Sequence, residues 1–381
     1  MKGSVRKKGT RWYYSFEVGA EHGKRKRIER AGGSTKKEAI EALRKALNEF
    51  EKCGSVIDES NVSVADYFDY WYKEYVLINC KYNTQINYKR IIENHIKPTL
   101  GIYQLKKITP AILQEFLNKK YRNGFTKNTI SGFYGVLSGA FKSSVYPYQF
   151  LKENPMQYVS MPKYNNDLEN TDDLKIINTE QFNVIINRFS EGSSFYIPLL
   201  IGFNTGMRAA EVCGLTWSCV DLENKFIKVE KILIHKEKEW VFGTPKTRSS
   251  NRKILIGDTL IKILKRHKKW QIENKLKYGK YYTESDFVCT KENGGLVTTD
   301  SLKYLSRIVN YELQIPFNFH SLRHTHATML LEADANIKDI QERLGHSKLA
   351  TTMDTYSHVT KKMKENSVNI FENLLAAKLP T

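Results

Sequence analysis

The stretch that most constrains this chain of 381 residues lies in its last fifth, between His320 and His358. It reads His320-Ser-Leu-Arg323-His-Thr-His, then Leu344-Gly-His346-Ser, then Thr352-Met-Asp-Thr-Tyr356-Ser-His358. The apolar spacing from residue 327 to residue 344 predicts a helix, a short turn and a second helix. Such a scaffold could draw imidazoles, a guanidinium and a phenol together. For any single residue, a capped helix end with an incidental histidine is the alternative.

Two further motifs lie upstream of this stretch. In Asn204-Thr-Gly-Met-Arg208-Ala-Ala-Glu211, a turn at Gly206 precedes a predicted helix, with Arg208 near its N-terminus and Glu211 one turn on. In Gly243-Thr-Pro-Lys246-Thr-Arg-Ser-Ser-Asn-Arg252, Lys246 lies between two strand-like runs. This position predicts that Lys246 is carried on a β-hairpin.

Together these motifs resemble the tyrosine recombinase family, the phage-type integrases, over residues 174 to 371. The resemblance rests on seven positions in the family's order, with the second histidine ten residues before the tyrosine. They are Arg208, Lys246, His320, Arg323, Gly345, His346 and Tyr356. One departure is Ala210, where the family usually has glycine, and a helix should tolerate the added methyl group.

The chemistry implied by these residues is attack of a phenol on a phosphodiester. The attack adds negative charge to the two non-bridging oxygens, and Arg208 and Arg323 can each donate two hydrogen bonds to them. Tyr356 is the expected nucleophile, and its ordinary pKa near 10 means that it needs a base or a strongly positive site.

The remaining site residues receive supporting roles. His320 is the expected base, and His346 can donate or move a proton near neutral pH. Lys246 is the expected acid for the leaving 5′-oxygen, and Glu211 is expected to orient Arg208 or a histidine. Structural roles are expected for His324, His326 and His358. No carboxylate cluster indicates a metal and no glycine-rich loop indicates ATP, so no cofactor is expected.

Charge and composition favour a polyanionic partner. The formal net charge is +19 and 41% of the residues are hydrophobic, which fits a soluble protein that binds nucleic acid. A cationic membrane-surface protein would show the same balance, but no apolar run approaches the roughly 20 residues of a spanning helix, and no signal-peptide core follows Met1. Five scattered cysteines indicate reduced thiols in a cytoplasmic protein and disfavour a zinc site.

Residues 1–56 are predicted to form a small sheet followed by a helix. Strand-like runs cover 11–18 and 25–30, and Thr35 and Glu38 form a capping box that opens the helix. Residues 1–30 hold ten Lys or Arg and three Glu, which favours a sheet laid against DNA over a merely solvated basic face. This unit resembles an arm-binding domain. Its candidate DNA contacts are Arg11, Trp12, Tyr13, Lys24, Arg25, Lys26 and Arg27.

The rest of the chain is predicted to form two further domains, giving a multidomain α+β protein. Residues 62–160 read as all-helical and resemble a core-binding domain, and residues 161–174 read as a linker. The catalytic unit, 175–381, is expected to begin with an N-cap at Thr179 and to hold one three-stranded antiparallel sheet with strands at 225–234, 240–242 and 252–256. Its apolar tail is expected to dock on a neighbouring subunit, and packing on its own core is the alternative. Candidate phosphate contacts in the helical domain are Lys89, Arg90, Lys106, Lys107 and Lys127.

The resemblance implies a site-specific DNA recombinase, an integrase of a phage or conjugative element. Its partners would be double-stranded DNA at core and arm attachment sites and a small directionality factor. Four protomers would act on two duplexes through a 3′-phosphotyrosine and a Holliday junction. The alternatives are a type IB topoisomerase, a catalytically silent DNA-binding regulator, and a resolvase of chromosome dimers, against which the basic N-terminal unit argues.

Overall fold

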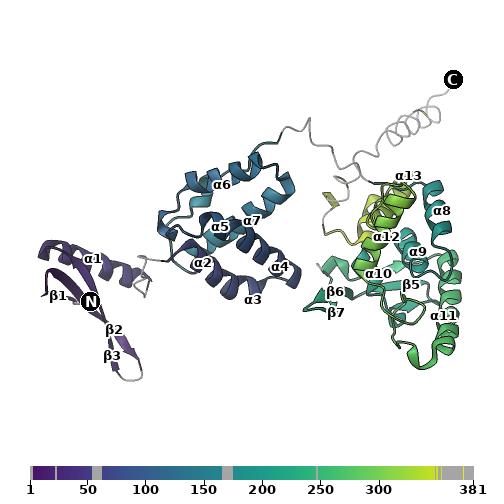
Figure 1. The fold of residues 1–381 in the computed structure, drawn as a ribbon, viewed down its shortest axis with the longest axis horizontal. Coiled ribbons are helices and arrows are strands. Elements are labelled where there is room, and N and C mark those ends of the chain that lie inside the picture. Colours follow the sequence, from purple (N-terminus) through teal and green to yellow (C-terminus); the bar gives the residue numbers. More distant parts are fainter. Residues whose placement is uncertain are drawn as a thin grey trace. The chain divides into compact units, whose positions relative to one another are not determined.

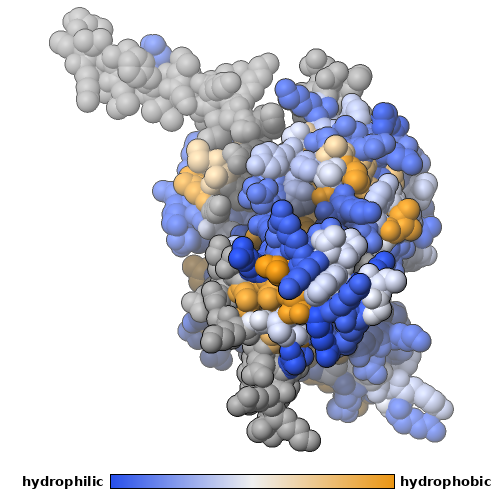
Figure 2. Space-filling model, turned by 90° about the vertical axis from the view of Figure 1, so that its left-hand side faces the viewer, coloured by the Kyte–Doolittle hydropathy of each residue, from blue (hydrophilic) through white to orange (hydrophobic). Residues whose placement is uncertain are grey.

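The protein is described here from a computed structural model. The structure describes residues 3–21, 24–53, 62–164, 175–245, 248–347, 349–350, 353 and 372. The chain divides into two compact units, residues 1–166 and 167–381. In Figure 2, hydrophilic residues predominate on the face in view and hydrophobic residues form a few separate patches. No helix within the described ranges is long and apolar enough to cross a membrane.

The N-terminal part is a three-stranded antiparallel sheet covered by one helix (Figure 1). Its elements are β1 (Gly3–Lys8), β2 (Arg11–Glu21), β3 (Lys24–Gly33) and α1 (Lys36–Cys53), in the order β1-β2-β3. The predicted capping box is present, because Thr35 Oγ1 accepts from the Glu38 amide and Glu38 accepts from the Thr35 amide, both at 3.3 Å. Tyr14 and Phe16 of β2 pack on Leu43 and Ala46 of α1.

The second part of the first unit is all-helical, as predicted. Its elements are α2 (Val64–Trp71), η1 (Tyr72–Val76), α3 (Leu77–Asn79), α4 (Tyr82–Ile91), η2 (Ile92–Ile96), α5 (Lys97–Leu100), η3 (Leu105–Lys107), α6 (Pro110–Arg122), α7 (Lys127–Val145) and η4 (Pro155–Tyr158). Ser63, Thr109 and Thr126 cap α2, α6 and α7 through their side-chain oxygens. The aromatic residues Tyr67, Phe68 and Trp71 lie in the core, where α2 packs against α5 and α7.

The second unit is mainly helical. Its helices are α8 (Thr179–Arg188), α9 (Tyr196–Thr205), α10 (Ala209–Cys213), α11 (Asp258–Tyr278), α12 (Thr299–Glu312), α13 (Ser321–Glu332) and α14 (Ile337–Leu344). α9 packs against α10, α11 and α13 (Figure 1), which explains why its residues 197–202 are all buried. The N-cap of α8 is Asn178, which forms a capping box with Gln181, so the prediction of Thr179 was wrong by one residue.

The predicted single three-stranded sheet of this unit was also wrong. β4 (Val220–Asp221), β5 (Phe226–Val229) and β8 (Arg252–Leu255) form one sheet, whereas β6 (Ile232–Lys236) pairs with β7 (Glu239–Gly243) in a separate hairpin. The run from 225 to 234 therefore contains two strands, which belong to different sheets. Consequently the segment between β7 and β8 connects two sheets and is not the turn of a hairpin.

Candidate active site

A left-handed turn after α9 positions the first arginine. Gly206 ends α9 with φ 66°, and its amide donates to the Gly202 carbonyl at 2.9 Å. Arg208 then occupies the N-cap of α10, and its amide donates to Glu211 Oε2 at 2.9 Å. The Arg208 side chain is 36% exposed and donates through Nη1 to Glu211 Oε1 at 2.9 Å. Arg208 is thus held by Glu211 through its amide and one terminal nitrogen, while its side chain remains partly exposed.

The second arginine, Arg323, is buried at the start of α13. Its Nη1 donates to the Gly206 carbonyl at 2.9 Å, and its Nη2 donates to the Leu344 carbonyl at 2.8 Å. It is 1% exposed. Arg323 therefore links the turn that presents Arg208 to the C-terminus of α14, so two of the distant motifs lie close together in the fold.

Two predicted histidines lie in the same electrostatic environment. His320 precedes α13, and its ring meets the His324 ring edge-on at 4.7 Å between centroids. Burial, together with His324, Arg323 and Arg208, lowers the pKa of His320 to about 4. His346 follows the left-handed Gly345 that ends α14, and burial together with Arg323 and Arg208 lowers its pKa to about 4 as well. Both imidazoles are neutral at pH 7 and can accept a proton.

His326 lies on α13 and has the structural contacts expected for it. Its Nδ1 bonds to the Phe203 carbonyl at 2.9 Å, and its Nε2 accepts from Arg343 Nε at 2.9 Å. Arg343 also donates to the carbonyls of Leu255 at 2.9 Å and Asn204 at 3.0 Å. This arrangement fixes the last turn of α14 against α9 and β8.

Glu211 bonds to arginines and to no histidine within the described part of the chain. Besides Arg208, it accepts from Arg252 Nη1 at 3.2 Å and Nη2 at 3.0 Å. Burial raises the pKa of the Glu211 carboxyl, but Arg252 and Arg208 lower it by more, so it stays ionised. No role was expected for Arg252 from the sequence. Its alternation with Ile254 in β8 could have indicated that its side chain points inward, because Arg252 and Ile254 are the buried residues of the strand.

Three predicted site residues lie outside the described residues: Lys246, Tyr356 and His358. The described strands on either side of Lys246 in the sequence are β7, which ends at Gly243, and β8, which begins at Arg252. The predicted roles of Lys246, Tyr356 and His358 as acid, nucleophile and support remain predictions.

The candidate DNA contacts of the N-terminal sheet separate into two faces. Trp12 alternates in phase with Tyr14 and Phe16, which lie on the face of the sheet that packs on α1. The Nζ atom of Lys36 lies over the Trp12 ring, 6.0 Å from its centroid. Tyr13 lies on the opposite face with its strand partner Arg6. Arg27 donates to Ser15 and Ser4 on this open face, Arg11 is exposed, and the side chains of residues 24–26 lie outside those described.

The candidates in the helical domain are all exposed. Lys89 and Arg90 lie in the last turn of α4, Lys106 and Lys107 in η3, and Lys127 at the start of α7. Exposure permits contact with phosphate groups.

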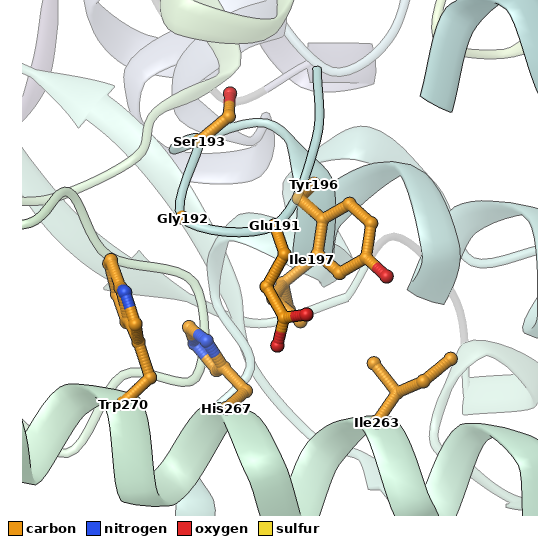
Figure 3. A pocket seen from close by; sticks show the side chains of 8 residues that line it. All are labelled: Glu191, Gly192, Ser193, Tyr196, Ile197, Ile263, His267 and Trp270. Atoms are coloured by element: carbon orange, nitrogen blue, oxygen red, sulfur yellow. The ribbon is translucent and has the colours of Figure 1, made fainter. Parts of the chain in front are cut away.

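A small enclosed cavity lies elsewhere in the second unit, between α11 and the loop that precedes α9 (Figure 3). Its volume of about 10 Å³ fits about one water molecule. His267 on its wall bonds through Nε2 to the Val288 carbonyl at 2.8 Å and stacks on Trp270. The predicted catalytic residues are not among those that line it, so this cavity is part of the scaffold.

Comparison with known proteins agrees with this geometry. The Phage integrase family matches residues 175–363, the Phage integrase N-terminal SAM-like domain matches 63–121, and the Arm DNA-binding domain matches 4–50. The Tyrosine recombinase XerC-like protein of Caldanaerobacter subterraneus is 31% identical over 365 residues, covering 90% of each chain. The ICEBs1 integrase of Bacillus subtilis is 26% identical over 353 residues, covering 90% of this chain and 91% of the relative.

Solved structures show the same fold. The Tn1549 transposon integrase in complex with transposon right end DNA superposes with a TM-score of 0.65 at 22% identity, covering 82% of this chain and 99% of that one. The lambda integrase tetramer bound to a Holliday junction gives a TM-score of 0.54 at 17% identity, covering 90% and 92%. The chain therefore belongs to the tyrosine recombinase family and is a site-specific DNA recombinase of the phage integrase type.

Proposed function

We propose that this recombinase cuts and rejoins DNA through a covalent bond between Tyr356 and the 3′-phosphate of the broken strand. The observation that carries the proposal is the convergence of two distant motifs, in which Arg323 bonds to the Gly206 turn that presents Arg208. A phosphate held by both guanidiniums would be neutralised as its charge grows. Because the phosphotyrosine conserves the energy of the broken bond, rejoining requires no cofactor.

The other side chains divide the proton transfers between them. His320 accepts the phenolic proton of Tyr356. It is neutral at pH 7, and so free to accept a proton, because its pKa lies well below 7. Lys246 protonates the leaving 5′-oxygen. His346, beside Arg323 and Arg208, donates a hydrogen bond to the phosphate.

The assembly that performs the exchange is a homotetramer on two duplexes, working through a Holliday junction. The similarity to the lambda integrase tetramer bound to a Holliday junction supports this architecture. The basic N-terminal unit, matched by the Arm DNA-binding domain, supports two binding specificities in one chain. One protomer would then hold a core site and an arm site on separated DNA, with a small directionality factor selecting integration or excision.

Strand exchange distinguishes this function from that of a type IB topoisomerase. The protein is incubated with two labelled duplexes that carry the attachment sites of its element, and with a supercoiled plasmid that lacks them. We expect recombinant duplexes from the first substrate and little relaxation of the second. Efficient relaxation of the plasmid without any strand exchange would contradict the proposal in favour of the topoisomerase.

Footprinting tests the two specificities. The full-length protein should protect core and arm sequences, and a variant lacking residues 1–56 should protect and cleave the core alone. The salt dependence of arm binding should follow a slope of about −0.9 for each phosphate neutralised. Identical footprints for the two proteins would show that the basic sheet is only a non-specific clamp.

A further inference from the structure

Arg252 makes four side-chain hydrogen bonds near the proposed catalytic residues. Its guanidinium uses all three nitrogens: Nε donates to the Arg343 carbonyl at 2.7 Å, Nη1 to Glu211 and to the Ser250 carbonyl at 3.1 Å, and Nη2 to Glu211 at 3.0 Å. The side chain is 6% exposed. Four of its five N–H donors are thus committed to Glu211 and to backbone carbonyls, so Arg252 is placed to hold these groups in position.

Glu211 receives hydrogen bonds from two arginines at once. Its carboxylate is 2% exposed and accepts from the amide and Nη1 of Arg208 as well as from both terminal nitrogens of Arg252. A buried carboxylate needs full compensation of its charge. With Arg252 present, Arg208 need contribute only one side-chain bond, and the rest of its guanidinium remains available to a phosphate.

Arg252 also contacts the turn that carries His346. It bonds to the carbonyl of Arg343, and a side-chain carbon placed on Gly345 would lie 3.0 Å from Arg252 Cδ and 3.1 Å from Nη1. Gly345 has φ 70°, so glycine is favoured there by backbone conformation as well as by space. The Arg252 side chain is therefore packed directly under the turn between α14 and His346.

We propose that Arg252 is a positioning residue for strand cleavage: it shares the charge of Glu211 so that Arg208 points at the scissile phosphate, and it supports the turn that presents His346. Without it, the buried carboxylate would draw Arg208 into a closed pair and away from DNA. This inference rests on the proposed function, in which Arg208 holds that phosphate.

The first test compares Arg252→Gln with Arg208→Ala on two suicide substrates, one with a normal scissile phosphodiester and one with a neutral methylphosphonate. A neutral linkage needs less compensation of charge, so the methylphosphonate should relieve the loss of Arg208. We expect Arg252→Gln to cleave the phosphodiester about 10²-fold more slowly, since a displacement of about 1 Å has that effect. On the methylphosphonate its defect should shrink to a few-fold.

The matched control is Arg188→Gln, which removes an exposed arginine paired with Glu312 on the surface, and it should cleave both substrates as the wild type does. An equal defect of Arg252→Gln on both substrates would mean a smaller folded fraction and would overturn the inference. If Arg208→Ala itself cleaves the phosphodiester normally, the proposed clamp fails instead. The two failures are thus distinguishable.

A second variant keeps the test valid if Arg252→Gln does not fold. Glu211→Gln combined with Arg252→Gln removes the buried carboxylate together with its partner, so no unpaired charge remains in the core. Arg208 is then no longer drawn away from DNA, and we expect the pair to cleave the phosphodiester faster than Arg208→Ala. Cleavage no faster than Arg208→Ala would contradict the inference.

Discussion

Replacing Arg323 by alanine should destabilise the catalytic unit as well as abolish cleavage. The side chain is 1% exposed, and two of its nitrogens donate to the carbonyls of Gly206 and Leu344, at the ends of α9 and α14. A hydrogen bond from a charged group contributes about 1.5–3 kcal/mol, and the loss leaves two buried carbonyls without this donor. The expected loss in the free energy of unfolding is about 3–5 kcal/mol.

Thermal unfolding of the full chain measures this loss. In a unit of this size each kcal/mol lowers the Tm by about 2–4 °C, so Arg323→Ala should melt about 6–20 °C lower. Tryptophan fluorescence reports on the relevant unit because Trp217, Trp240 and Trp270 lie in it. Arg188→Ala, which removes an exposed ion pair with Glu312, should melt within about 2 °C of wild type. If Arg323→Ala melts equally close to wild type, the proposed structural role of Arg323 is wrong.

Three further predictions follow from individual residues. Gly206→Ala should cost about 1–3 kcal/mol in urea unfolding, because φ is 66° and the added carbon would lie 2.7 Å from Leu344 Cδ2; unchanged stability would contradict the geometry. Burial lowers the pKa of His267 to about 4, so the unfolded state binds more protons between pH 6.5 and 4, and this group should make stability fall by up to about 3 kcal/mol on acidification through that window; His267→Gln should make the fall smaller by that amount, while the contribution of His320 and His346 remains. Lys246→Ala should cleave ordinary DNA poorly but recover when the scissile 5′-oxygen is replaced by sulfur, which leaves without a proton; no recovery would make Lys246 a phosphate contact.

Local signals in the sequence predicted much of the fold. The capping box at Thr35 and Glu38 and the turn at Gly206 each fix a helix end through bonds to near neighbours. These helix ends depend on short motifs whose physical effect does not change with the surrounding structure. The order of the domains and the convergence of Arg208 with Arg323 followed instead from the family resemblance.

Features that depend on long-range pairing could not be read from the sequence. The run from 225 to 234 gives no sign that β5 pairs with β8 while β6 pairs with β7, because pairing is settled by packing between distant segments. The sequence does not indicate that Arg252 pairs with Glu211, because the two residues are distant in the chain. Trp12, a candidate DNA contact, shares the parity of the core residue Phe16, so this alternation indicates the face of the sheet on which it lies.

The most direct test of the proposed mechanism is the identity of the residue that becomes bonded to DNA. A nicked suicide substrate traps the covalent intermediate, and mass spectrometry of the digested adduct locates the link. The mechanism predicts a 3′-phosphate on the peptide containing Tyr356, and no adduct from Tyr356→Phe, which should still bind DNA because only the phenolic oxygen is lost. An adduct that persists in Tyr356→Phe, or that maps to another side chain, would contradict the mechanism.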